Sequence, residues 1–354
     1  MTLQTIADRV GVSRMTVSNA FSRPDQLSQE LRERILTTAQ ELGYVGPDPA
    51  GRALARGSTG AVGILLTDSL GEAFADEVAT RFLRAVVDGL APTGLALTLI
   101  TATDRDDVVP ARDVAIDGAL VYSCRTGSPA RELLLQRRLP VVFVDQEPQP
   151  GIPSVNVDDR AGAYASARHL ADLGHRRVGL FTLVLDRSAG VTDDPRALAM
   201  GHPQQQRLDG WLAGLEEAGA QPTVVHVPHD DADHADEGAA LMLGIEPGVT
   251  AVLCFSDVLA FGVLRSARAR GLAVPDDLSV VGFDDHPLAS RSEPPLTTVR
   301  QDLTAKGRLA ATTLTAAIAR TRAAGSATTR ARHHLLPTEL VIRSSTAPPP
   351  LSKR

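Results

Sequence analysis

The stretch I-A-D-R-V-G-V-S-R-M-T-V-S-N-A-F-S, residues 6–22, predicts two short helices joined by a tight turn. Ile6 and Val10 share one face of the first helix, because residues four apart are neighbours on a helix surface. Gly11 follows, where the chain must turn and a positive φ is favoured. Ser13 can cap the second helix by accepting bonds from N–H groups of its first turn. This is the pattern of a helix-turn-helix, a motif whose second helix enters a DNA major groove.

The second predicted helix has an apolar face and a polar face. Val17 and Phe21 repeat at helical spacing and are expected to face the first helix. The opposite face carries Arg14, Met15 and Asn19. An arginine can bond guanine O6 and N7 together, and an asparagine can bond adenine N6 and N7. We therefore predict that these three residues read bases; the alternative is an ordinary polar surface helix.

Short hydroxyl side chains surround this polar face. Ser13, Thr16 and Ser18 are suited to contact phosphate oxygens, which fix the register of a protein on DNA without carrying sequence information. A third helix is expected over about 29–42, and Tyr44 follows it. The Tyr44 hydroxyl can reach a phosphate, or it can be the wet tip of a packing residue.

Residues 47–60 read P-D-P-A-G-R-A-L-A-R-G-S-T-G, which leaves room for one short helix. Leu54 is its only large apolar residue, and a helix this short is marginally stable by itself in water. One interpretation is a hinge helix that inserts Leu54 between base pairs in the minor groove; the other is a plain linker. Gly51 costs about 1 kcal/mol of helix stability relative to alanine, so the helix would depend on a partner or on DNA.

The order of these elements, with A-G-R-A-L at 50–54, resembles the LacI/GalR-type repressor family. The resemblance implies a periplasmic-binding-protein-like body in which the chain crosses between two lobes three times, and we place the crossings near 158–162, 287–293 and 320–330. Further stretches that resemble the family, in the family's order, are 61–68, 117–122, 140–145, 153–162, 173–180, 281–285 and 294–302.

The body sequence predicts the same fold without the resemblance. Apolar β-rich runs alternate with helical runs from 61 to 282, which favours parallel sheets covered by helices on both faces. The break Q-E-P-Q-P-G-I-P at 146–153 separates two such sets. We therefore expect an α-helical helix-turn-helix head and an α/β body of two doubly wound parallel-sheet lobes, with a ligand at the carboxyl ends of the strands.

The predicted boundaries follow from these patterns. Residues 1–46 form the DNA-binding domain and 47–60 the hinge. Residues 61–343 form the effector-binding and dimerisation body, and 344–354 form a disordered tail. Within the body, we assign 61–158 and 293–320 to the first lobe and 162–287 and 330–343 to the second. The long loop 186–203 abuts the cleft and is either a lid or a disordered insertion.

Polar residues at predicted strand ends are candidates for holding the effector. An arginine with carboxylates across a cleft suits the vicinal hydroxyls of a sugar. The resemblance implies that Arg207, which precedes L-D-G-W, and Asp284, the first aspartate of G-F-D-D, contact the effector. The other candidates are Asp68, Ser69, Phe74 and Ser256, with capping, ion-pairing or core packing as the alternative roles.

Composition narrows the function classes. The net charge is −6, with +1 on residues 1–57 and −7 on the rest, so DNA affinity must come from charge placement and from two half-sites bound at once. The sequence shows neither a secretory signal nor an apolar run of about 20 residues. Cys124 and Cys254 lie in apolar contexts and are expected to be free thiols in a reducing cytoplasm.

No nucleophile elbow, phosphate loop or zinc-protease motif occurs, so we predict no catalytic residues, metal or cofactor. The His-rich run 226–237 fits a solvated loop better than a metal site. The prediction is a cytoplasmic, homodimeric transcriptional repressor of a near-palindromic operator, controlled allosterically by a sugar-like effector. The tail lacks leucine heptads, which favours a dimer over a tetramer. The alternatives are a solute-binding module without DNA activity and an enzyme on the same fold.

Overall fold

A computed structural model describes residues 1–46, 48–66, 70–101, 109–123, 127–184, 187–198, 201–245, 248–324 and 331–350. The chain divides into two compact units, Met1–Gly60 and Ala61–Arg354. Each unit is described by itself. Three residues named above, Asp68, Ser69 and Cys124, lie outside the described residues.

The first unit is a small helical head followed by a short helix. Its elements are α1 (Leu3–Val10), α2 (Arg14–Ser22), the 3-10 turn η1 (Pro24–Gln26), α3 (Gln29–Glu41) and α4 (Pro49–Arg56). Gly11 turns the chain between α1 and α2 with a φ of 77°. Ser13 caps α2, because its Oγ accepts a hydrogen bond of 3.0 Å from the Thr16 amide. The buried core of the head consists of Ile6, Ala7, Val17, Ala20, Ile35 and Ala39.

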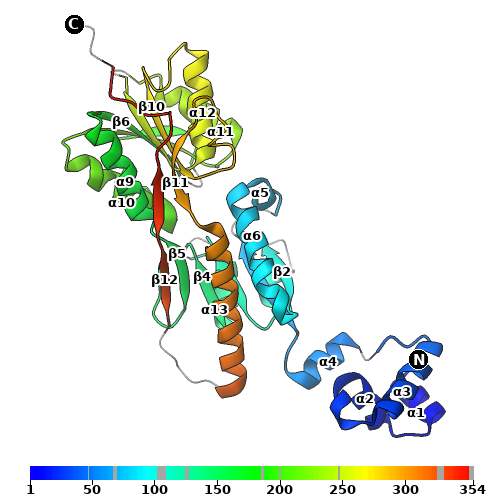
Figure 1. The fold of residues 1–354 in the computed structure, drawn as a ribbon. Helices are drawn as coiled ribbons and strands as arrows, with labels where there is room; N and C mark the ends of the chain where they lie inside the picture. The colour runs from blue at the N-terminus through cyan, green and yellow to red at the C-terminus, as the bar shows by residue number, and fades with distance from the viewer. Residues whose placement is uncertain are drawn as a thin grey trace. The chain divides into compact units, whose positions relative to one another are not determined.

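The first lobe of the body is built on a parallel sheet whose described strands have the order β12-β5-β4-β3-β1-β2 (Figure 1). Its strands are β1 (Ala61–Leu66), β2 (Ala96–Thr101), β3 (Ala119–Tyr122), β4 (Val141–Val144), β5 (Ser154–Val157) and β12 (His333–Leu336). Its helical elements are α5 (Leu70–Ala75), α6 (Glu77–Leu90), η2 (Ala91–Thr93), α7 (Pro110–Asp113), α8 (Pro129–Gln136) and α13 (Leu303–Ala324). The central strands β1, β3 and β4 are apolar on both faces because helices cover both faces of the sheet.

The second lobe has a sheet of order β13-β11-β10-β9-β6-β8-β7. Its strands are β6 (Arg177–Leu183), β7 (Gly190–Thr192), β8 (Gln221–Val227), β9 (Ala251–Cys254), β10 (Ser279–Asp284), β11 (Thr297–Gln301) and β13 (Thr338–Val341). Its helical elements are α9 (Asp159–Asp172), η3 (Pro195–Ala197), α10 (His202–Glu216), α11 (Ala232–Met242) and α12 (Asp257–Ala269). Only the two edge pairs, β7 with β8 and β13 with β11, are antiparallel among the described strands.

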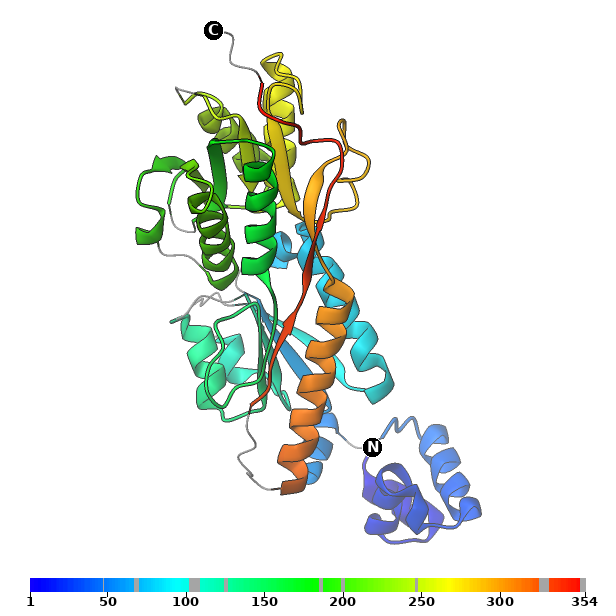
Figure 2. The ribbon, with the colours of Figure 1, turned by 60° about the vertical axis from the view of Figure 1, so that its left-hand side comes forward.

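The chain passes between the lobes at Asp158, Asp302 and Pro337, and Figures 1 and 2 show β12 running on into β13. The second and third predicted crossings, 287–293 and 320–330, are therefore wrong. The predicted lobe segments 293–320 and 330–343 are each divided between the two sheets. The helical runs expected from the sequence lie before residue 282 and do not include α13. Local apolar patterns show where a strand or helix begins. They do not show which sheet the strand joins, because that depends on hydrogen bonds to strands far away in the sequence.

The predicted disordered tail is partly ordered. Ser345 is fully buried. Its Oγ donates to the Val280 carbonyl at 2.6 Å and accepts from the Thr297 amide at 2.8 Å, so it joins β10 to β11. Residues 344–347 bond to the second sheet and the loop before β11, because these still offer polar groups to be paired, and 351–354 lie outside the described residues. Within the loop predicted as a lid or insertion, β7 extends the same sheet at β8.

Two close helix crossings position the side chains of the cavity described below. A Cβ on Gly210 of α10 would come within 2.8 Å of the Ala163 Cβ on α9. A Cβ on Gly307 of α13 would come within 2.5 Å of the Ala85 Cβ on α6. Glycine is needed at both places, because any side chain would push the paired helices apart. Within the described residues, no helix has the length and apolarity that a membrane span requires.

Candidate effector site

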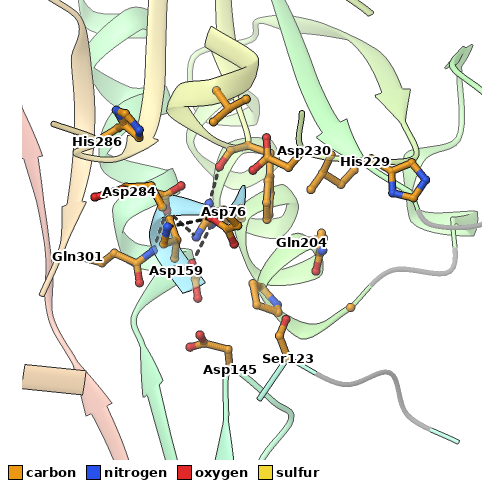
Figure 3. Close-up of a pocket in the computed structure, with 18 of the residues that line it drawn as sticks. Asp76, Ser123, Asp145, Asp159, Gln204, His229, Asp230, Asp284, His286 and Gln301 are labelled. Carbon is orange, nitrogen blue, oxygen red and sulfur yellow. Dashed lines mark hydrogen bonds and ion pairs between the residues drawn. The ribbon is translucent and has the colours of Figure 1, made fainter. Parts of the chain in front are cut away.

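A cavity of about 460 Å³ lies between the lobes, beyond the carboxyl ends of strands from both sheets (Figure 3). The first lobe contributes Asp76, Tyr122, Asp145 and Lys306 to its wall. From the second lobe come Asp159, Gln204, Arg207, His229, Asp230, Phe255, Asp284, His286 and Gln301. This volume is in the range of small-molecule sites, and a ligand within it would touch both lobes.

Arg207 on α10 is the centre of the wall contributed by the second lobe, and only 4% of its surface is exposed. Its Nε donates to Asp159 Oδ1 at 2.8 Å, and its Nη2 donates to Asp284 Oδ1 at 3.3 Å. Its Nη1 donates to the Phe255 carbonyl. The guanidinium also lies 4.3 Å from the centroid of the Phe255 ring and 3.6 Å from that of Phe283. These contacts hold the guanidinium in one orientation.

Asp284, at the end of β10, has a φ of 106°, which L-residues rarely adopt. Such a backbone costs about 1–3 kcal/mol, and it persists where the surroundings impose it. Here β9 and β11 hold β10 on both sides. The strained turn brings the Asp284 carboxylate to Arg207 and to the cavity.

A buried polar chain joins the two lobes. Gln301 at the end of β11 donates from Nε2 to Asp284 at 2.7 Å. Its Oε1 accepts a bond of 2.9 Å from Lys306 Nζ on α13. Lys306 also forms an ion pair of 2.6 Å with Asp145 Oδ2, which follows β4 in the first lobe. Hydrogen bonds therefore run from Asp145 of the first lobe to Arg207 of the second.

The cavity raises the pKa values of several carboxyl groups. Burial raises the pKa of Asp159 to about 6, although the Arg207 charge opposes this. Burial also raises the pKa of Asp230 to about 8, opposed by the hydrogen bond from Ser256 and reinforced by the charges of Asp76 and Asp284. These shifts show that carboxyl groups from several elements share one poorly solvated space.

Two oxygens on the cavity wall have no hydrogen-bond partner within the described structure, Asp145 Oδ1 and Gln204 Oε1. Buried polar atoms are normally paired, so these acceptors are suited to ligand O–H or N–H donors. No group of three or more His, Cys, Asp or Glu in the described residues could hold a metal ion. The wall is thus rich in acceptors, which suits a ligand with many hydroxyl groups.

The head presents the face predicted to read DNA. Arg14 is exposed, and 71% of the Met15 surface is accessible. Asn19 donates from Nδ2 to Gln26 Oε1 at 3.2 Å, a contact that orients its amide. The Tyr44 ring packs edge-on against the Phe21 ring, with 5.7 Å between the ring centroids.

Comparison with known proteins shows to which family the chain belongs. Residues 2–46 match the model of bacterial regulatory proteins of the lacI family, and residues 167–346 match a periplasmic binding protein-like domain. The HTH-type transcriptional regulator IpsA of Corynebacterium glutamicum is 39% identical, over 88% of this chain and 90% of IpsA. This chain belongs to the LacI family. It is a transcriptional regulator with an effector-binding body.

Two solved structures agree with this LacI-family fold. The transcriptional regulator CelR–cellobiose complex is 27% identical, with a TM-score of 0.69 over 98% of this chain and 99% of that one. The lac repressor dimer bound to operator and the anti-inducer ONPF is 23% identical, with a TM-score of 0.76 over 98% and 99% of the two chains. The second likeness concerns the fold alone.

The structure brings together only some of the predicted effector residues of this LacI-family chain. Arg207 and Asp284 meet at the cavity. Ser256 does not line the cavity: it is buried, caps α12 through the Leu259 amide, and donates to Asp230 at 2.5 Å. Phe74 does not line it either, and 58% of its surface is exposed. The first N–H groups of a helix have no partner within the helix, and the Ser256 hydroxyl accepts a hydrogen bond from one of them at the start of α12.

Other wall residues were missed, although the sequence carried signals for them. Asp145 directly follows the β-rich run 140–144, so the strand-end argument applied to it. Gln301 lies inside the family-like stretch 294–302, where no strand was expected. Lys306 had a compositional signal, because the chain contains only one other lysine, Lys353. The other 34 basic residues are arginines, so the chain uses arginine almost everywhere else that it needs a positive charge. No local pattern indicates that Asp230 faces the same space.

Proposed function

We propose that this LacI-family regulator is a homodimeric repressor whose operator affinity changes when a polyhydroxylated effector, a sugar or sugar derivative, binds between its lobes. The observation that carries the proposal is the buried chain from Asp145 through Lys306 and Gln301 to Asp284 and Arg207. An effector that bonds to this chain would contact both lobes at once. It would therefore favour one arrangement of the lobes over another.

The acceptor-rich wall supports a hydroxyl-bearing effector, and the cellobiose complex of the related CelR supports the same class. The dimer of the lac repressor on operator supports two heads on one near-palindromic site. Half-sites would then lie about 34–36 Å apart, one helical turn of DNA. Arg14, Met15 and Asn19 read bases; Ser13, Thr16, Ser18 and Tyr44 contact phosphates; and Leu54 of α4 is the wedge in the minor groove.

A gel-shift titration tests this function. The purified chain is mixed with DNA from upstream of its own gene and with a shuffled duplex of the same composition, at several salt concentrations. We expect specific retention that weakens as salt rises, because phosphate contacts release counterions. A panel of sugars is then screened by thermal shift, and stabilising sugars are added to the gel shift. Equal retention of both duplexes would contradict the proposal.

Arg14→Ala tests base reading. We expect the affinity for the specific site to fall by about 1–3 kcal/mol and discrimination to relax at one base position, because a bidentate bond to guanine is lost. Affinity for the shuffled duplex should fall much less. Competition binding with single-base variants of the operator measures both effects. Arg9→Ala, in the last turn of α1, is the matched control for loss of one positive charge.

Gly51→Ala should strengthen operator binding about fivefold for each of the two hinge helices of the dimer, because alanine favours a helix by about 1 kcal/mol. Among the described residues, a Cβ at this position of α4 meets the Asp48 Cβ at 3.9 Å, so the methyl group has room there. Fluorescence anisotropy with labelled operator measures the change. Gly57→Ala is the control, because Gly57 lies outside α4 with a φ of 63° where alanine is strained. An unchanged affinity in Gly51→Ala would show that helix formation does not limit binding.

A further inference from the structure

The cavity wall carries many more acidic than basic side chains. Its acidic residues are Glu77 and six aspartates, Asp76, Asp145, Asp159, Asp230, Asp231 and Asp284, and Arg207 and Lys306 are the arginine and lysine that line it in the described structure. Both cations are already engaged. Every nitrogen of Arg207 donates to Asp159, Asp284 or a carbonyl, and Lys306 donates to Asp145 and Gln301. A ligand carboxylate or phosphate would have to displace one of these partners.

Two of the aspartates form no ion pair within the described residues. Asp76 precedes α6 and accepts a bond of 2.8 Å from the Val78 amide. Asp230 follows β8 and accepts the bond from the Ser256 hydroxyl. They come from different lobes and both line the cavity (Figure 3). The negative charge of Asp76 is one of the causes that raise the pKa of Asp230, so the two groups interact.

A further observation points to a donor-bearing ligand. Asp145 is more than nine-tenths buried, and its Oδ1 has no partner in the described structure while its Oδ2 pairs with Lys306. An ammonium group offers three N–H donors and a positive charge, and so matches a wall of carboxylates better than a hydroxyl does. A carboxylate or phosphate offers only acceptors and meets like charge.

We propose that Asp76 and Asp230 determine the specificity of the cavity by forming an ammonium-selective subsite, so that the effector is an amine-bearing polyol and anionic sugars are excluded. This proposal rests on the proposed effector-binding function. To that function it adds that the effector is positively charged and that Asp76 and Asp230 are the residues that recognise this charge.

Three linear six-carbon polyols that differ only at C1 test the proposal with the full-length chain. D-glucamine carries an ammonium at C1, D-glucitol a hydroxyl and D-gluconate a carboxylate. Isothermal titration calorimetry at pH 7 should give affinities in the order D-glucamine, D-glucitol, D-gluconate. We expect about tenfold between the first two, as for a charge close to two carboxylates in a partly buried site. An equal or reversed order overturns the proposal.

Lack of binding by all three at about 20 mM also overturns the proposal, because the cavity has room for a six-carbon chain and charge attraction does not require one pattern of hydroxyls. In that case, operator retention and binding of a neutral sugar would still support the proposed function. Loss of specific operator retention would instead contradict the proposed function itself.

Variants in which an aspartate is replaced by the uncharged asparagine test which residues cause the preference for D-glucamine. Asp76→Asn and Asp230→Asn should each reduce the preference for D-glucamine over D-glucitol at least threefold, and the double variant should remove it. Glu216→Gln, an exposed position on α10, makes the same change of charge away from the cavity and should keep the preference. Thermal unfolding of each variant checks that it folds. Folded variants that retain the preference overturn the assignment of these two residues.

The pH dependence gives a second readout. Asp76 on α6, Asp284 on β10, Arg207 on α10 and the Ser256 hydroxyl at α12 act on Asp230, whose pKa is about 8 without ligand. An alkylammonium keeps its proton below about pH 9. The affinity for D-glucamine should therefore rise from pH 6 to pH 8 as Asp230 loses its proton, and binding at pH 7 should release protons. A flat profile for D-glucamine contradicts the role of Asp230.

Discussion

Leu54→Ala is expected to weaken operator binding about 100-fold while leaving effector affinity unchanged. In the free chain 87% of the Leu54 surface is exposed, so its truncation removes little packing from the folded protein. On operator DNA, the side chain would fill a gap between two base pairs. A wedge of this kind compensates for an unstacking cost of a few kcal/mol, and without it the bent duplex is no longer favoured.

Fluorescence anisotropy with labelled operator and calorimetry with a stabilising sugar measure the two affinities separately. Leu241→Ala on α11 makes the same substitution at a partly exposed position of the body and should leave operator binding unchanged. Operator binding by Leu54→Ala that equals that of the unmodified chain would rule out the wedge and favour a plain linker. The Gly51→Ala variant acts on the same helix in the opposite direction, so the pair separates helix formation from contact with bases.

Arg207→Ala should lower the free energy of unfolding by about 3–5 kcal/mol and abolish the response to effector. The substitution leaves Asp159 and Asp284 buried without their shared cation, and a buried charge without its partner is costly. It also removes the group stacked on the Phe255 and Phe283 rings. Urea unfolding measures the stability, and gel shifts with and without a stabilising sugar measure the response.

The loss of stability in Arg207→Ala should be larger at pH 8 than at pH 5. Burial already raises the folded-state pKa of Asp159 to about 6, and without the Arg207 charge it rises further. An acid whose folded-state pKa is raised costs stability as the pH climbs from its unfolded value through the folded one. The triple change Arg207→Met, Asp159→Asn and Asp284→Asn should restore much of the stability without restoring the effector response. A full response in Arg207→Ala would contradict its placement in the site.

The head and the layered plan of the body could be predicted because their determinants are local. Gly11 with a positive φ, Ser13 at the start of α2 and the buried Val17 all act within a few residues of one another. The alternation of apolar strands and helices likewise indicates parallel sheets, whichever strand pairs with which. Asp284 could be named because it follows a predicted strand, and the resemblance to a family gave both Asp284 and Arg207 their expected role.

The lobe crossings, the ordered tail and most of the cavity wall were decided by tertiary structure. Lys306 pairs with Asp145 across 161 positions of the chain, and Ser345 reaches back to Val280 across 65. Contacts between residues so far apart in the chain produce no periodic pattern in the sequence. Ser256 was expected to bind effector, yet it caps α12 and bonds to Asp230, because a strand from one segment and a loop from another end at the same place. Local patterns determine where helices and strands form. Which strands pair, and which polar side chains bond to one another, depends on the sheet edges and buried polar groups that still lack a hydrogen-bond partner once the helices and strands have assembled.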